Sequence, residues 1–259
     1  MHHNAVKAKL RRGERVYGTS LEDCLSPEMP VVLAAAGLDF FFIDTEHSPA
    51  GYGEIQALCR SAHDRGIVPL VRVTENLPHL ISRALDVGAS GVIVPRLKSA
   101  EEARAIVKCV KFPPLGERGF GLRSVNTDLK GGPAPAAITA SNEETMVVAM
   151  IETREAVEDV ENIAAVEGVD ALFIGPYDLS LSLGILEQFD SPIFWGAVDR
   201  VLAAAKAAGI AAGLQSRNLS QLAEAQKRGA RFLLLGGDSA TLLDGYRRAL
   251  AELKGSQTA

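Results

Sequence analysis

Ionisable side chains directly follow several short apolar runs in this sequence. The run Phe40–Asp44 continues as Thr-Glu-His-Ser-Pro, which places two carboxylates and an imidazole, Asp44, Glu46 and His47, within four residues. A neighbouring acid can fix the tautomer of an imidazole and stabilise its charged form, which makes a general base near neutral pH. We therefore predict that His47 is a general base, with Asp44 or Glu46 as the acid beside it. The alternative is a solvated loop in which Asp44 caps a turn.

An arginine is embedded in the apolar stretch PLVRV. A buried guanidinium without a partner is very unfavourable, so Arg72 needs an anion. One candidate is a structural ion pair with a carboxylate such as Glu46 or Glu152. The other is a substrate oxygen that gains negative charge in the transition state.

Two further carboxylates stand at the ends of the apolar runs Met146–Thr153 and Ala171–Pro176. Glu152 and Asp178 have no Cys or His ligand beside them, and such a pair suits a hard cation with open positions, Mg²⁺ or Mn²⁺ before Zn²⁺. Alternatively, Glu152 lies in the first turn of a helix and Asp178 is the N-cap of Leu179–Leu183.

Eight short apolar runs recur along the chain, with helical patterns between them. Runs such as FFFID, GVIVP and FLLLG are continuously apolar, which is typical of parallel strands buried on both faces. The expected strands are Val16–Thr19, Phe40–Asp44, Val68–Val73, Gly91–Pro95, Met146–Thr153, Ala171–Pro176, Ala211–Gln215 and Phe232–Gly236. We predict one domain over residues 1–259, a single (β/α)₈ TIM barrel, with a doubly wound open sheet as the alternative. In such barrels the active site lies at the carboxyl ends of the strands, where the ionisable residues above are expected.

Two segments interrupt this rhythm. Residues 116–144 are rich in Gly and Pro and are predicted to form a long functional loop after the fourth strand, with Gly121 able to approach a ligand. Residues 1–12 lack an apolar leader segment and are expected to be flexible.

Composition excludes several classes of protein. The chain has 27 basic and 32 acidic residues, a net charge of −5 and no dense basic cluster, which argues against nucleic acid as a partner. It contains three cysteines without a CxxC pair, which indicates a reducing compartment. No stretch approaches the roughly 18 apolar residues of a membrane span, so we expect a cytoplasmic protein that does not bind a membrane.

Five separated motifs now point to a known family. IDTEHSP, PLVRV, PPLGERGFG, MIETREAV and GVDALFIGPYDLSLSLG occur in this order between about Gly18 and Ala249. Together they resemble the HpcH/HpaI-type class II 2-oxo acid (pyruvate) aldolases, which include 4-hydroxy-2-oxoheptanedioate aldolase and 2-keto-3-deoxy sugar-acid aldolases. The resemblance implies a barrel of the phosphoenolpyruvate/pyruvate-domain type and a lyase that reversibly cleaves a 4-hydroxy-2-oxo acid to pyruvate, or a close analogue, and an aldehyde.

The resemblance also implies roles for individual residues. Glu152 and Asp178 would hold Mg²⁺, Mn²⁺ or Co²⁺, Arg72 would contact the keto oxygen that becomes an enolate, and His47 with Asp44 would move the proton. It implies no organic cofactor and a homotrimer or homohexamer. The residues expected to contact substrate are Arg72, Gly121, Met150, Gly175, Pro176 and Tyr177. Relatives often have Gln in place of Met150 and a small residue in place of Tyr177, which leaves the aldehyde open.

Other reactions are less consistent with the residues. A Schiff-base aldolase needs a lysine at the mouth of the barrel, and only Lys98 closely follows an expected strand. The remaining alternatives are an acyl-CoA lyase of the citrate-lyase-beta type and a non-catalytic barrel that binds a small acid.

Overall fold

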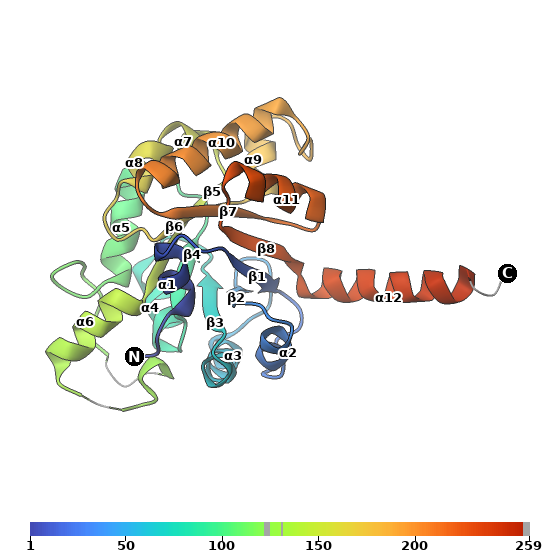
Figure 1. Ribbon diagram of the computed structural model, residues 1–259. Coiled ribbons are helices and arrows are strands. Elements are labelled where there is room, and N and C mark those ends of the chain that lie inside the picture. Colours follow the sequence, from blue (N-terminus) through green and yellow to red (C-terminus); the bar gives the residue numbers. More distant parts are fainter. Residues whose placement is uncertain (122–124, 131, 256–259) are drawn as a thin grey trace.

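Eight parallel strands pair in sequence order, and β1 closes the sheet on β8 (Figure 1). The computed structural model describes residues 1–121, 125–130 and 132–255. The strands are β1 Val16–Leu21, β2 Phe40–Asp44, β3 Val68–Arg72, β4 Gly91–Val94, β5 Met146–Ile151, β6 Ala171–Ile174, β7 Ala211–Ser216 and β8 Phe232–Gly237. The predicted barrel is confirmed, because the closed strand order excludes an open doubly wound sheet.

Helices lie around most of the barrel and alternate with its strands (Figure 1). They are α1 Ala5–Arg11, α2 Met29–Ala35, α3 Tyr52–Arg65, α4 Pro78–Asp86, α5 Ala100–Val110, α6 Ala134–Glu144, α7 Arg154–Glu158, α8 Val160–Ala164, α9 Pro176–Ser182, α10 Pro192–Ala207, α11 Leu219–Arg228 and α12 Asp238–Gly255, with a 3₁₀ turn η1 at Val125–Thr127. None of the described helices combines the length and the apolar composition that a membrane span requires.

Aromatic side chains fill the interior of the barrel. Phe40 stacks on Phe232 with ring centroids 4.5 Å apart, and Phe173 meets Phe232 edge-on at 5.8 Å. Gly18 makes room for this packing, because a Cβ there would lie 2.6 Å from the ring of Phe40. The interior is therefore a packed core, and the polar groups that could bind a ligand lie at the mouth above it.

The amino-terminal residues form a helix that covers the other end of the barrel. Val6 and Leu10 of α1 are buried in the same cluster as the interior aromatic rings. The Asn4 side chain accepts a hydrogen bond from Lys7 N and donates to Ser90 O. The prediction of flexible residues 1–12 is therefore wrong, because two apolar residues four apart on one helix face pack against the open core.

The segment 116–144 also differs from its prediction. It follows α5 rather than β4 directly, contains η1 and α6, and leads into β5 at the amino end of the barrel. Residues 122–124 and 131 lie outside the described part of the chain. Gly121 borders a small hollow with Met1 and Phe112, at the end of the barrel opposite to the mouth.

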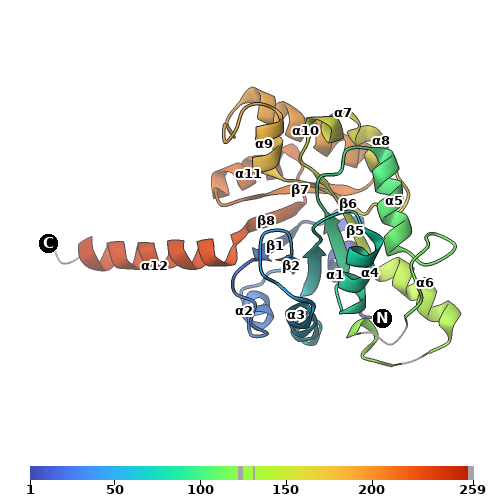
Figure 2. The same cartoon turned by 180° about the vertical axis from the view of Figure 1, so that it is seen from behind.

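The last helix does not fold back over the barrel as its predecessors do. Helix α12 extends away from the body of the molecule in both ribbon views (Figures 1 and 2). Its exposed apolar side chains are Leu242, Leu243, Tyr246, Leu250 and Leu253. A long helix with a solvent-exposed apolar face is a surface that another chain could cover.

Candidate active site

Asp44 and Arg72 form a bidentate ion pair at the mouth. The two residues are register partners in the β2–β3 pair. Arg72 Nε lies 2.9 Å from Asp44 Oδ1, and Arg72 Nη2 lies 2.5 Å from Asp44 Oδ2. Asp44 is fully buried, and its Oδ1 also accepts a hydrogen bond from Glu46 N at 2.9 Å. Asp44 therefore orients the guanidinium and holds the loop after β2.

Glu46 is a second acid beside the same guanidinium. Its Oε2 lies 3.5 Å from Arg72 Nη1, and its Oε1 lies 2.7 Å from Arg96 Nη2. The ion pair between Arg72 and Glu46, one of the structural alternatives from the sequence, is thus confirmed, although Asp44 makes the closer contact. Arg96 was missed in the sequence, where its only signal is its place directly after the run GVIVP.

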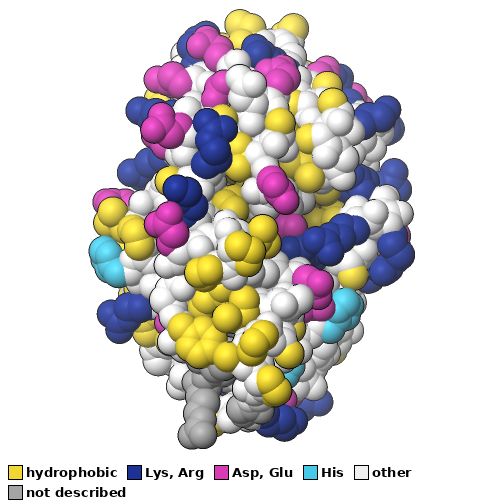
Figure 3. Space-filling view, turned by 90° about the vertical axis from the view of Figure 1, so that its left-hand side faces the viewer, with side chains coloured by type: hydrophobic (Ala, Val, Ile, Leu, Met, Phe, Trp, Pro, Cys, Tyr) yellow, Lys and Arg dark blue, Asp and Glu magenta, His cyan; other side chains and the backbone are white. Residues whose placement is uncertain are grey.

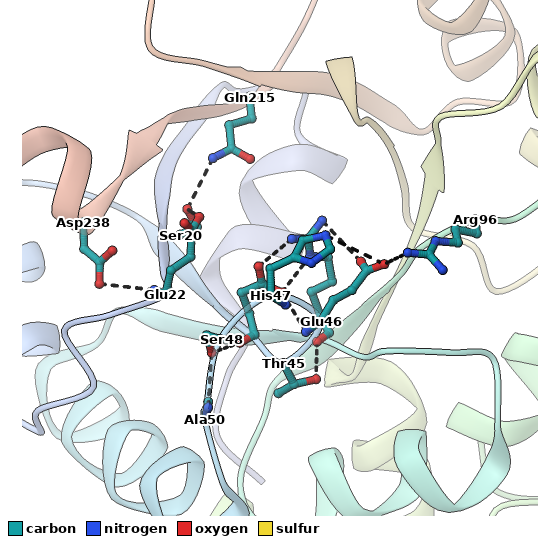
Figure 4. Close-up of polar contacts among 12 residues, drawn as sticks. Ser20, Glu22, Thr45, Glu46, His47, Ser48, Ala50, Arg96, Gln215 and Asp238 are labelled. Atoms are coloured by element: carbon teal, nitrogen blue, oxygen red, sulfur yellow. Dashed lines mark hydrogen bonds and ion pairs between the residues drawn. The ribbon is translucent and has the colours of Figure 1, made fainter. Parts of the chain in front are cut away.

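His47 lies on the exposed side of this cluster (Figure 4). Its side chain is 58% exposed, and Nε2 lies 4.0 Å from Glu46 Oε1. Asp44 contacts the backbone N–H of His47 at 3.4 Å and directs its carboxylate to Arg72. Of the two acids that the sequence offered, Glu46 is therefore the one beside the imidazole, whereas the resemblance implied support by Asp44. Both acids stand within three residues of His47, so only the path of the loop could distinguish them.

Glu152 is a buried carboxylate directly after β5. It is 2% exposed, and its Oε1 accepts a hydrogen bond of 2.6 Å from Arg96 N. Arg96 adopts a left-handed backbone conformation with φ of 55°. Burial raises the pKa of Glu152 to about 7; the hydrogen bond from Arg96 N opposes the rise, while the nearby carboxylates of Asp178 and Glu46 add to it.

Asp178 lies in the first turn of α9, whose N-cap is Gly175. The alternative that Asp178 is itself an N-cap is therefore wrong. The alternative for Glu152 is also wrong, because the N-cap of the following helix α7 is Thr153. The negative charge of Asp178 contributes to the raised pKa of Glu152, and the role of the two acids as metal ligands stays a prediction.

Gly175 leaves room for the Glu152 carboxylate. A Cβ at this position would lie 2.5 Å from Glu152 Oε2 and 2.6 Å from Met150 Cε. Pro176 is buried at the start of α9, whereas Tyr177 is 53% exposed and meets Phe189 edge-on at 5.2 Å. These residues form the β5–β6 side of the mouth.

The donor set fits a divalent cation with several open positions. Within residues 1–121, 125–130 and 132–255, no group of three or more His, Cys, Asp and Glu side chains could hold a metal. Glu152 and Asp178 supply two carboxylates whose mutual repulsion a cation would relieve. Mg²⁺ and Mn²⁺ accept such oxygen ligands and fill their remaining positions with water or substrate oxygens.

Interactions join the two sides of the mouth into one site. Arg96 contacts Glu152 through its backbone and Glu46 through its side chain, and the charge of Arg72 acts on Glu152. Gly121 is the predicted substrate residue that the structure does not bring to this site within one chain. The other predicted residues lie at or just after the carboxyl ends of β2, β3, β5 and β6: Asp44, His47, Arg72, Met150, Glu152, Gly175, Pro176, Tyr177 and Asp178.

A second polar group lies where β7, β8 and β1 meet (Figure 4). Gln215 Nε2 donates to Ser20 Oγ at 3.3 Å, and Ser20 Oγ donates to Glu22 Oε1 at 2.7 Å. Asp238 accepts hydrogen bonds from the backbone N–H groups of residues 22–24 and so holds the loop after β1. These residues were also missed, because single polar residues at strand ends carry no motif.

A barrel whose mouth combines a buried guanidinium with converging carboxylates is suited to an enzyme that stabilises a developing oxyanion. Residues 24–245 match the model of the HpcH/HpaI aldolase/citrate lyase family, and the chain belongs to this family.

Named relatives agree with this membership. The chain is 36% identical over 250 residues to a 4-hydroxy-2-oxovalerate aldolase from Novosphingobium aromaticivorans, covering 95% of this chain and 94% of the relative. It is 33% identical over 248 residues to a 2-dehydro-3,6-dideoxy-6-sulfogluconate aldolase from Pseudomonas putida, covering 96% of each. The crystal structure of an HpcH/HpaI aldolase from Desulfitobacterium hafniense DCB-2 superposes with a TM-score of 0.91 at 37% identity over 96% of both chains. The chain is an aldolase and hence a carbon–carbon lyase.

Proposed function

We propose that this aldolase reversibly cleaves a 4-hydroxy-2-oxo acid to pyruvate, or a close analogue, and an aldehyde, with Mg²⁺, Mn²⁺ or Co²⁺ as cofactor. The observation that supports this most directly is the buried Glu152 carboxylate directly after β5, on which the charges of Asp178 and Arg72 act. Relatives named as aldolases of 4-hydroxy-2-oxovalerate and of 2-keto-3-deoxy-L-rhamnonate support the substrate class.

Glu152 and Asp178 would hold the cation. When bound, the cation supplies a Lewis acid that polarises the oxygens of the 2-oxo acid. The side chain of Gly175 is a single hydrogen, so the Glu152 carboxylate fits against the end of β6. The adjacent Met150, Pro176 and Tyr177 would contact the substrate.

Arg72 would stabilise the enolate oxygen that forms when the carbon–carbon bond breaks. Asp44 holds Nε and Nη2 of its guanidinium, which fixes the plane of the group before substrate binds. A donor that is already oriented needs little reorganisation as charge develops. Asp44 is in this proposal a positioning residue for Arg72 and for the loop that carries His47.

His47 would move the proton between the hydroxyl of the substrate and solvent. Its exposed ring can exchange protons with water, and the Glu46 carboxylate lies 4.0 Å from its Nε2. The reverse reaction uses the same group as an acid.

The chain would act as a homotrimer or homohexamer in the cytoplasm. Helix α12 projects from the body of the molecule (Figure 2). Its exposed apolar face supports assembly, because a monomer would leave this face in water. The cysteines Cys24, Cys59 and Cys109 are free, which is consistent with a reducing compartment. Light scattering coupled to size exclusion would measure the assembly.

A coupled assay tests the metal-dependent reaction. Pyruvate released from 4-hydroxy-2-oxovalerate is reduced by lactate dehydrogenase, and NADH consumption is followed. We expect exhaustive chelation to abolish release and added Mn²⁺ to restore it. Full activity after chelation would contradict the proposal.

The variant Glu152→Gln distinguishes a role of Glu152 in metal binding from a role in stabilising the fold. We expect turnover to fall by about 10³-fold or more, since the cation contributes several kcal/mol to transition-state stabilisation. The melting temperature should hold or rise, because the change removes a buried carboxylate next to two others. Glu158→Gln on the exposed side of α7 is the matched control and should keep wild-type turnover.

A further inference from the structure

Gln215 is a polar residue that points into the mouth and has no role in the reaction described above. Side chains alternate along a strand, and Ala211 of β7 belongs to the interior cluster with Phe173 and Phe232. Gln215, four residues further on, therefore also faces the interior. It is partly exposed, so it borders the open mouth rather than the packed core.

The amide of Gln215 is held in one orientation. Nε2 donates to Ser20 Oγ at 3.3 Å and to Gly236 O at 3.1 Å. Both amide protons are thereby used, so the carbonyl oxygen Oε1 is the group left to bind a ligand among the described contacts. Ser20 Oγ in turn donates to Glu22 Oε1, which adds a second acceptor group beside the first (Figure 4).

The strand register places Gln215 next to the catalytic side of the mouth. Ile151, Ile174 and Leu214 pair in register across β5, β6 and β7. Glu152, Gly175 and Gln215 are the next residues on these three strands and share the inward direction. Because Gly175 has no side chain, the Glu152 carboxylate lies over the end of β6, the strand that pairs with the one carrying Gln215.

The hydrogen-bonding properties of Gln215 and Glu22 determine which ligand groups they can bind. Gln215 Oε1 and the Glu22 carboxylate are hydrogen-bond acceptors. They therefore do not match the carboxylate and keto oxygens of a 2-oxo acid, which are acceptors as well. They match a hydroxyl group, which donates. The Glu22 charge also disfavours a second carboxylate at this place.

We propose that Gln215, held by Ser20 and Gly236, binds a hydroxyl group of the aldehyde and selects uncharged hydroxyaldehydes over unhydroxylated and acidic ones. This inference rests on the proposed aldolase function. It adds the aldehyde class, which the metal ligands and Arg72 do not specify.

The test compares two three-carbon aldehydes that differ by one hydroxyl. Lactaldehyde and propanal are each condensed with pyruvate and Mn²⁺ by the full-length protein, and kcat and KM are measured separately. We expect the wild type to prefer lactaldehyde in kcat/KM and to disfavour succinic semialdehyde. In Gln215→Leu the preference for lactaldehyde should fall by about tenfold, mainly through KM, which is the upper range for one neutral hydrogen bond.

Two further variants keep the test decisive. Gln56→Leu on the outer helix α3 makes the same change away from the mouth and should retain the wild-type preference. Ser20→Ala removes one partner of the amide and should lower the preference by a few-fold; it replaces Gln215→Leu if that variant does not fold. An unchanged preference in the folded Gln215 or Ser20 variant overturns the inference.

The outcomes also separate this inference from the function it rests on. If the wild type joins pyruvate to none of the aldehydes and does not exchange the methyl protons of pyruvate in D₂O, the proposed function fails. If it condenses both aldehydes but Gln215→Leu leaves their ratio unchanged, only the role of Gln215 fails.

Discussion

Charged side chains are buried at both ends of the barrel, but their surroundings differ. At the carboxyl end, burial raises the pKa of Glu152 to about 7, and the charges of Glu46 and of the exposed Asp178 add to the rise. At the amino end, Lys7 Nζ lies 2.9 Å from Asp170 Oδ1 beneath α1, and Lys111 Nζ donates to Thr145 O at 2.6 Å. Both ends contain ion pairs, but the carboxyl end also places the buried Glu152 near other acids, whereas the amino end pairs its buried lysines with Asp170 or bonds them to backbone carbonyls.

A cavity of about 610 Å³ lies at the amino end as well, lined by apolar residues such as Leu10 and Ile138 together with Lys111. Apolar side chains also gather on the surface of the side that carries α5 and α6 (Figure 3). A cavity alone does not therefore mark the active site here. What distinguishes the mouth is a group of acids whose negative charge a metal cation would balance. Active sites of such barrels generally lie at this end.

Among the changes that test this comparison of the two ends, replacement of Arg72 should lower turnover the most. Arg72→Ala should lower turnover by about 10²–10³-fold, because it removes one stabiliser of the enolate oxygen. Steady-state release of pyruvate measures it. The amino-end control is Arg231→Ala, which loses hydrogen bonds to Leu10 O and Ile210 O and should reduce stability while retaining turnover. Near-normal turnover in Arg72→Ala would remove this residue from the mechanism.

An intermediate effect is expected where α1 closes the barrel. Leu10→Ala should lower the free energy of unfolding by about 2–4 kcal/mol, because it removes buried apolar atoms and leaves a cavity. Urea unfolding followed by circular dichroism measures this loss. Turnover below the unfolding transition should stay within about twofold of wild type, and a large fall in kcat would contradict the separation of the two ends.

The smallest effect concerns the pH dependence of stability. Burial lowers the pKa of Lys111 to about 7, with the charge of Asp170 opposing and that of Lys7 adding to the shift. Between about pH 7 and 10.5 the unfolded chain holds a proton that the folded chain has released, so this lysine makes the protein more stable as pH rises through that window.

Lys111→Met removes this titration. The difference in free energy of unfolding between wild type and variant should therefore shift in favour of wild type from pH 7 to pH 9.5. Urea titrations at both pH values measure it, with Lys254→Met near the exposed end of α12 as the control. A constant difference across this range would show that the Lys111 pKa is ordinary.

Most of the site was predictable because its residues end apolar runs. Glu152, Asp178, Arg72 and His47 each follow or close a strand, and a parallel barrel brings all strand ends of one kind to one mouth. Their types and positions therefore implied the chemistry. The resemblance of the motifs to one family indicated the same reaction.

The incorrect predictions concern segments without periodic patterns. Residues 116–144 were expected to form a loop beside the site because their Gly and Pro content breaks the rhythm of the barrel. Their place after α5 instead puts them at the amino end. Gly and Pro indicate a turn, but they do not indicate the end of the barrel at which it lies.

The sequence by itself determined the barrel, the family and the acids and arginine at its mouth, because strand periodicity and residue type are local properties. Only the tertiary structure decided which acidic side chain contacts which basic side chain. Asp44 binds Arg72 while Glu46 lies by His47, and Gln215 joins Ser20 from β7, because these contacts depend on the register and closure of strands far apart in the chain.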